Sequence, residues 1–128
     1  FDIVDYKNFE THISDEFLKK NKFKQYLSDL SEKTEYDKHY ELLNNADIIF
    51  IDAPKDGKFE YKLLENMTNL KNKENKILIF DDIKLMNMIN LWNSIKSPKM
   101  DVASVGNWTG TGLVDISKGL ILNKQNER

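Results

Sequence analysis

Two apolar runs that each end in acidic residues constrain the fold of this chain most. Residues 47–52 read Asp-Ile-Ile-Phe-Ile-Asp, and residues 77–82 read Ile-Leu-Ile-Phe-Asp-Asp. A continuous run of β-branched and aromatic residues is typical of a strand that is buried on both faces of a parallel sheet. We therefore predict two central parallel strands, each followed by carboxylates.

Segments with helical periodicity separate the predicted strands. Apolar side chains recur at helical spacing in residues 11–21, 36–45, 58–70 and 86–95, and a Ser-Pro pair follows the last of these segments. Parallel neighbours in a sheet need long crossover connections, which are usually helices. The alternation therefore predicts an α/β domain with a mostly parallel sheet covered by helices.

The two ends of the chain carry further predicted strands. Residues 1–5 resemble the C-terminal end of a strand, and residues 23–30 alternate like a second strand. Residues 100–105 and 112–116 follow each other through a glycine-rich loop, which predicts an antiparallel hairpin at the sheet edge. Because the chain opens on a strand end without an initiator Met, we expect one domain, residues 1–128, that is incomplete at its N-terminus.

Composition narrows the class of protein. A chain of 128 residues that is 40% hydrophobic can form one ordinary core, and it contains no apolar run long enough for a membrane span. The absence of cysteine excludes disulfides and fits a cytoplasmic protein. The 19 basic and 21 acidic residues are well mixed, so no basic face for nucleic acid is expected. The abundance of Lys and Asn indicates an AT-rich bacterial genome.

Acidic residues follow the predicted strands, at the edge where open parallel sheets bind ligands. Asp2, with Asp5 as the second choice, could accept hydrogen bonds from both hydroxyls of a ribose, because a carboxylate is a bidentate acceptor. Ser28 or Asp29 could accept a hydrogen bond from an adenine amino group. The alternative is that each acid only ends a turn or caps a helix.

Asp52, Asp81 and Asp82 form a second predicted group, on adjacent strand ends. Three carboxylates without His or Cys partners suit Mg²⁺, which prefers oxygen ligands. Without a metal, Asp52 could act as a general base toward an acceptor hydroxyl. Trp108, in the glycine-rich loop, either forms a wall of an acceptor pocket or folds back onto the sheet, and we favour the second.

On these segments the chain resembles the class I S-adenosylmethionine-dependent methyltransferases, and more closely a bacterial group related to the metal-dependent catechol-type O-methyltransferases. The matching segments are residues 1–4, 46–52, 76–83 and 110–114. The resemblance implies a Rossmann-like fold and methyl transfer from S-adenosylmethionine to a hydroxyl oxygen of a small molecule or sugar. The first strand and the glycine-rich cofactor loop of the family have no counterpart in this chain.

The resemblance also assigns roles to the cofactor-binding candidates. Asp2 matches the acid that binds the cofactor ribose, and Ser28-Asp29 matches the adenine contact. Two further interpretations remain open for these residues and for the domain. A nicotinamide-dependent dehydrogenase also binds a ribose through an acid, although the terminal hairpin argues against it. A non-catalytic module would keep the fold as a binding or assembly surface, and a homodimer fits either class.

The same resemblance implies catalytic and metal-binding roles at the next two strand ends. Asp52 matches an acid that is catalytic or metal-binding in the catechol-type enzymes. Asp81 and Asp82 match a metal-binding Asp-Asn pair, so that Mg²⁺ is an expected second cofactor. The chain has Asp instead of Asn in this pair, and residues 53–55 also depart from the catechol-type pattern, which argues against a catechol acceptor. A signalling receiver domain gathers similar acids around Mg²⁺, but its acidic pair comes first in the chain.

Overall fold

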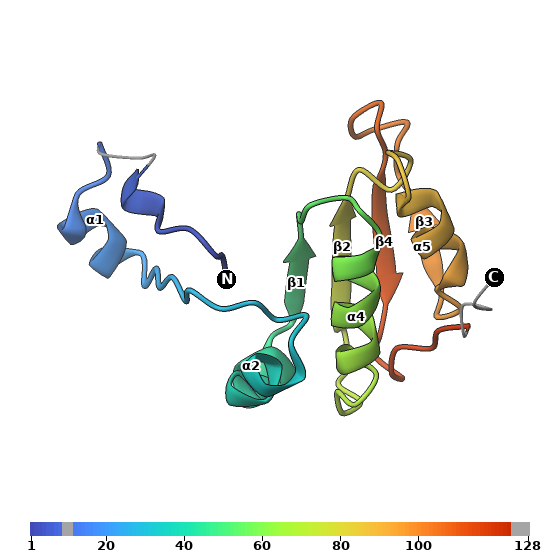
Figure 1. Ribbon diagram of the computed structural model, residues 1–128, viewed down its shortest axis with the longest axis horizontal. Coiled ribbons are helices and arrows are strands. Elements are labelled where there is room, and N and C mark those ends of the chain that lie inside the picture. Colours follow the sequence, from blue (N-terminus) through green and yellow to red (C-terminus); the bar gives the residue numbers. More distant parts are fainter. Residues whose placement is uncertain (9–11, 124–128) are drawn as a thin grey trace.

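The computed structural model describes residues 1–8 and 12–123, which contain one four-stranded mixed sheet (Figure 1). The strands are β1 (Ile48–Ile51), β2 (Ile77–Asp81), β3 (Lys99–Asp101) and β4 (Thr111–Asp115). Their order across the sheet is β1-β2-β4-β3. β1 and β2 are parallel, whereas β4 is antiparallel to both β2 and β3. The predicted α/β class and the C-terminal antiparallel hairpin are therefore confirmed. The prediction of a mostly parallel sheet is wrong, because among the described strands only β1 and β2 pair in parallel, and β4 is antiparallel to both of its neighbours.

The described helices are short, and two of them connect strands, whereas the others precede β1. The described residues form α1 (Asp15–Lys20), α2 (Lys33–Lys38), α3 (Tyr40–Asn45), α4 (Lys58–Met67), α5 (Met88–Ser94) and the 3₁₀ helix η1 (Tyr6–Asn8). The single helix predicted over residues 36–45 is instead two helices that meet at His39. The start of the helix predicted over residues 11–21 lies outside the described residues. Among the described helices, none is long and apolar enough to cross a membrane.

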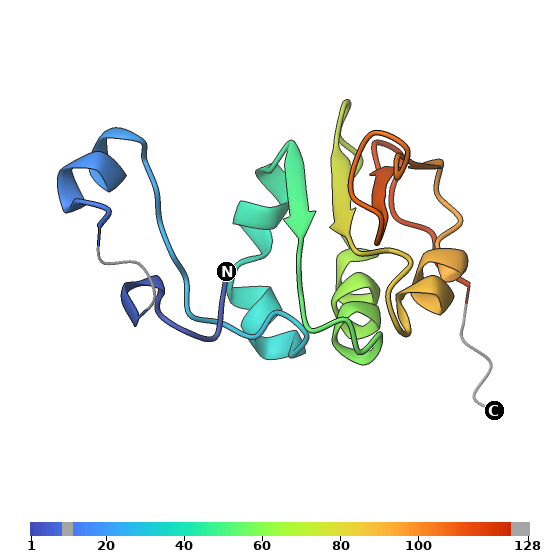
Figure 2. The same ribbon diagram turned by 90° about the horizontal axis from the view of Figure 1, so that it is seen from above.

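The core lies between the sheet and the helices α4 and α5, which cover the same face (Figures 1 and 2). Leu78 and Phe80 of β2 and Val114 of β4 are fully buried on this face. Leu64 of α4 and Leu91 of α5 are fully or almost fully buried in the same cluster. Successive side chains of a strand point to opposite faces, so the alternate residues of β2 and β4 lie on the other face.

The prediction that the strand at residues 47–52 is central and buried on both faces is wrong, because β1 is an edge strand of the described sheet and one of its two faces is exposed. Its Phe50 lies in register beside Ile79, Leu113 and Met100, which form a row across the face opposite α4 and α5. Phe50 and Met100 are 60% and 62% exposed. An apolar run indicates that a segment forms a strand, but the burial of that strand depends on which elements cover its two faces.

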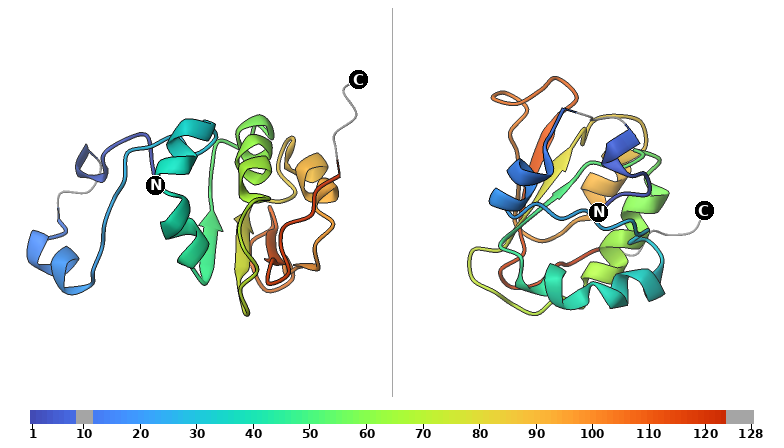
Figure 3. Two further views of the ribbon diagram at one scale, coloured as in Figure 1. Left: turned by 90° about the horizontal axis from the view of Figure 1, so that it is seen from below. Right: turned by 90° about the vertical axis from the view of Figure 1, so that its left-hand side faces the viewer.

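The strands predicted at residues 1–5 and 23–30 are reduced to a single parallel bridge between Asp2 and Leu27. The amide of Asp2 donates to the carbonyl of Tyr26 at 3.0 Å, and the amide of Ser28 donates to the carbonyl of Asp2 at 2.9 Å. These residues, with η1 and α1, lie beyond the β1 edge of the sheet (Figure 3). An isolated pair of strands is marginally stable, so the ladder does not extend without a further neighbour.

Gly112 of β4 packs directly beneath Trp92 of α5. A Cβ atom at Gly112 would lie 2.5 Å from Cζ3 and 2.7 Å from Cη2 of Trp92. We expect Gly112→Ala to lower the free energy of unfolding by about 1–3 kcal/mol, because the helix must move away from the sheet. Urea unfolding measures this change.

The control for this prediction is the double variant Gly112→Ala/Trp92→Phe. Phenylalanine lacks the outer indole ring, so it leaves space for the new methyl group. The two substitutions should therefore cost less together than the sum of their separate effects. Additive effects would show that the contact with Trp92 does not require glycine at this position.

Candidate functional site

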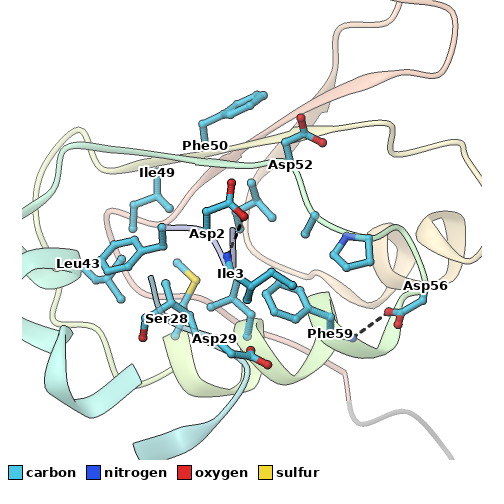
Figure 4. Close-up of a pocket in the computed structure, with 17 residues that line it drawn as sticks. Asp2, Ile3, Ser28, Asp29, Leu43, Ile49, Phe50, Asp52, Asp56 and Phe59 are labelled. Atoms are coloured by element: carbon cyan, nitrogen blue, oxygen red, sulfur yellow. Dashed lines mark hydrogen bonds between the residues drawn. The ribbon is translucent and has the colours of Figure 1, made fainter. Parts of the chain in front are cut away.

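A cavity of about 500 Å³ lies between the N-terminal segment and the C-terminal end of β1 (Figure 4). Residues 1–3 and 28–30 form one side of the cavity, and residues 49–54 form the other. Apolar side chains, including Leu30, Leu43 and Met67, line its interior. The cavity therefore combines an apolar lining with the polar ends of several chain segments, which is the usual composition of a small-molecule site.

The structure brings the three predicted cofactor-binding residues and Asp52 to this one cavity. Asp2, Ser28, Asp29 and Asp52 all line it, although they come from separate segments of the chain. In the view of Figure 4, Asp52 lies at the top, Ser28 and Asp29 lie at the bottom, and Asp2 lies between them. Asp5, the second choice for a ribose contact, is not among the lining residues.

The polar residues that line the cavity also form hydrogen bonds with residues near them in the chain. Oδ1 of Asp2 accepts hydrogen bonds from the amides of the next two residues at 2.7 and 3.2 Å. Oδ1 of Asp29 accepts from the amide and hydroxyl of Ser31 at 2.9 and 2.7 Å. The hydroxyl of Ser28 donates to Glu35 at 2.9 Å. Asp2 and Asp29 therefore form the turns that we gave as the alternative to ligand binding, and these hydrogen bonds orient their side chains at the cavity.

Asp52, Asp81 and Asp82 converge at the adjacent strand ends, as the sequence predicts. One carboxylate oxygen from each residue lies within 4.8 Å of the others. The reason is topological, because β1 and β2 are parallel and end at the same edge of the sheet. Of these three acids, only Asp52 also lines the cavity. Asp52 therefore connects the cavity to the acid cluster, which we define as Asp52, Asp81 and Asp82.

The loop between β3 and β4 packs against the acid cluster. The side-chain amide of Asn107 donates to Oδ1 of Asp81 at 2.9 Å, and the hydroxyl of Thr109 donates to Asp82. Trp108 lies between them and is 88% exposed, so the prediction that it folds back onto the sheet is wrong. Because its two neighbours turn toward the acids, Trp108 is directed into solvent. It does not line the cavity either.

Lys55 is the functional candidate that sequence analysis missed. Its ammonium group forms an ion pair with Asp52 and lies 3.4 Å from Oδ2 of Asp82. Burial lowers the pKa of Lys55, but the two carboxylates outweigh this effect and raise the pKa above its ordinary value. The sequence feature that could have identified Lys55 is its position three residues after an acidic strand end, in a turn that leads to a helix.

The acid cluster was expected to bind Mg²⁺, and its donors are of the kind that this ion prefers. Their spacing would also allow them to share one ion. However, the ammonium group of Lys55 already contacts two of the three carboxylates. The cluster therefore does not fit a divalent cation while Lys55 holds this position.

The fold and the site define an α/β domain with an acid-lined cavity at the C-terminal end of a parallel strand. No protein-family model, curated protein or solved structure matches the chain. The function must therefore be argued from the geometry of the cavity and its surroundings.

Proposed function

We propose that this chain is a Rossmann-like S-adenosylmethionine-dependent methyltransferase domain that methylates a hydroxyl oxygen of a small molecule or sugar. The observation that carries the proposal is the joint lining of one cavity by Asp2, Ser28, Asp29 and Asp52. These residues come from three separate segments of the chain, and the resemblance gives each of them a role toward the cofactor or the acceptor. The lack of cysteine agrees with a cytoplasmic location, which is part of the proposal.

The sheet supports the same proposal. Two parallel strands are followed by a C-terminal hairpin whose second strand, β4, inserts in antiparallel orientation between β2 and β3. This arrangement is more specific than that of a general doubly wound sheet, and it contains the C-terminal hairpin that the glycine-rich loop predicts. It disfavours the nicotinamide-dependent dehydrogenase, for which a terminal hairpin was not expected.

Different residues of the cavity would bind different parts of the cofactor. The Asp2 carboxylate would accept hydrogen bonds from the ribose hydroxyls, and Ser28 or Asp29 would bind the adenine amino group. Leu30, Leu43 and other apolar lining residues would cover the faces of the adenine ring. Bound S-adenosylmethionine supplies an electrophilic methyl group on its sulfonium.

Asp52 lies where the cavity meets the acid cluster, so it would orient the acceptor hydroxyl and accept its proton. Displacement at the methyl group requires an in-line approach of the acceptor oxygen. Most of the rate acceleration would therefore come from holding the two reactants close and aligned.

Calorimetric titration of S-adenosylhomocysteine into the full protein that the gene encodes tests this proposal. We expect saturable binding at one site, and we expect Asp2→Ala to weaken it at least about tenfold, because a charged acceptor for two hydroxyls is lost. Asp5→Ala is the matched control, since Asp5 lies on the same segment but does not line the cavity.

An absence of binding by the wild-type protein would overturn the methyltransferase proposal. It would favour a second candidate, a non-catalytic binding or assembly module. The observation behind this candidate is the apolar row across the open face of the sheet, in which Phe50 and Met100 are largely exposed. Equal loss of binding in Asp2→Ala and Asp5→Ala would contradict the specific role of Asp2 and point to a general disturbance of the N-terminal segment.

A further inference from the structure

We propose that Lys55 is the resident cation of the acid cluster and takes the place that a divalent metal ion would otherwise occupy. The inference goes beyond methyl transfer, because it concerns the charge balance of the cluster and holds whichever ligand the cavity binds. It explains how three carboxylates can converge at one edge of the sheet, because the ammonium group offsets part of their negative charge.

The position of the ammonium group is the first argument. Nζ of Lys55 contacts Asp52, which follows β1, and lies 3.4 Å from Oδ2 of Asp82, which follows β2. The side chain of Lys55 is only 10% exposed, in contrast to the surface lysines that dominate this chain. The ammonium group therefore bridges two strand ends in the manner expected of a shared cation.

The backbone of Lys55 is held in place independently of its side chain. Its amide donates to Oε1 of Glu60 at 2.7 Å, and the amide of Gly57 donates to Oε2 at 3.0 Å. Glu60 is completely buried. Lys55 also has a positive φ of 67°, a conformation that costs energy for a residue with a side chain. The fold thus maintains a strained residue whose ammonium group points into the acid cluster.

Two further oxygens of the cluster accept hydrogen bonds from the loop between β3 and β4. Thr109 donates its hydroxyl to Oδ1 of Asp82, and Asn107 donates its side-chain amide to Oδ1 of Asp81 at 2.9 Å. A metal ion would have to displace Lys55 and compete with these donors. If Lys55 stayed, the metal would lie beside a like charge in a partly buried site, where the repulsion is strong.

A lysine side chain is positively charged at neutral pH, and the ammonium group of Lys55 faces two carboxylates from different strand ends. Lys55 therefore supplies one positive charge to the acid cluster. Removal of this charge should convert the acid cluster into a metal site.

Titration with Mn²⁺, followed by the electron paramagnetic resonance signal of the free ion, tests the proposal on the full protein. We expect Lys55→Ala to bind one Mn²⁺ at least about tenfold more tightly than the wild-type protein. The double variant Lys55→Ala/Asp82→Asn should lose this gain, because a ligand is removed. Lys84→Ala is the matched control, since Lys84 pairs with Asp101 at 3.3 Å near the same edge and lies outside the cluster.

Lys55→Gln provides a second variant that removes the charge but keeps most of the aliphatic chain. It should also gain Mn²⁺ binding, and circular dichroism checks that each variant is folded. Tight Mn²⁺ binding by the wild-type protein that Asp82→Asn abolishes would overturn the proposal, because metal and lysine would then coexist. A folded Lys55→Gln or Lys55→Ala without a gain in affinity would overturn it as well.

Discussion

Replacement of Lys76 by Met is expected to lower the free energy of unfolding by about 2–4 kcal/mol, as measured by urea unfolding. Lys76 is completely buried, and its ammonium group donates to the carbonyls of Leu43, Asn44 and Ala46 at 2.6, 2.9 and 2.6 Å. These carbonyls belong to the C-terminal end of α3, where a positive charge also complements the helix dipole. Methionine fills a similar volume but leaves all three acceptors without this donor.

An exposed lysine provides the control for this prediction. Lys62 lies 3.9 Å from Glu32 in an ion pair whose two side chains are both largely exposed. Lys62→Met should therefore change the free energy of unfolding by less than about 1 kcal/mol. Similar effects of the two substitutions would contradict the structural role that we assign to Lys76. A large loss at Lys76 alone would show that this residue connects α3 to the start of β2.

Glu60→Ala should have an effect of comparable size, a loss of about 2–4 kcal/mol in the free energy of unfolding. The buried carboxylate of Glu60 accepts hydrogen bonds from the amides of Lys55 and Gly57, which precede α4. Alanine would leave both donors unsatisfied and create a cavity under the turn that follows β1. Urea unfolding again measures the change.

Glu65→Ala is the matched control, because Glu65 lies on the same helix and is exposed. It should have little effect on stability, since it removes the same charge without exposing buried donors. If Glu60→Ala were as mild as Glu65→Ala, the turn would be held by other contacts. In that case the fixed backbone of Lys55, on which its placement in the acid cluster partly depends, would lose its main support.

Local pattern was sufficient to predict the elements that form the core of the fold. The apolar runs that became β1 and β2 and the helical spacing that became α4 and α5 were visible in the sequence, because each repeats within a few residues. The grouping of Asp52, Asp81 and Asp82 was also predictable. It follows from parallel pairing alone, which brings the C-terminal ends of neighbouring strands to one edge.

The two buried lysines were not predictable in the same way. The residues that accept hydrogen bonds from Lys76 lie about 30 positions earlier in the chain. Lys55, which follows β1, contacts Asp82, which follows the neighbouring strand β2. Nothing in the immediate sequence of Lys76 distinguishes it from the many exposed lysines, and the local signal for Lys55 is only its position three residues after an acidic strand end. The burial of a charged side chain is decided by partners that only the tertiary structure brings together.

The sequence by itself determined the strands β1 and β2, the helices α4 and α5 and the positions of the carboxylates after the strands, because these properties depend on neighbours within one turn or one strand. Only the tertiary structure decided that β1 is an edge strand, that Phe50 and Met100 are exposed, and that Lys55 lies among the acids. The physical reason is that burial and charge pairing are properties of contacts between distant segments, whereas hydrophobic periodicity is a property of the chain.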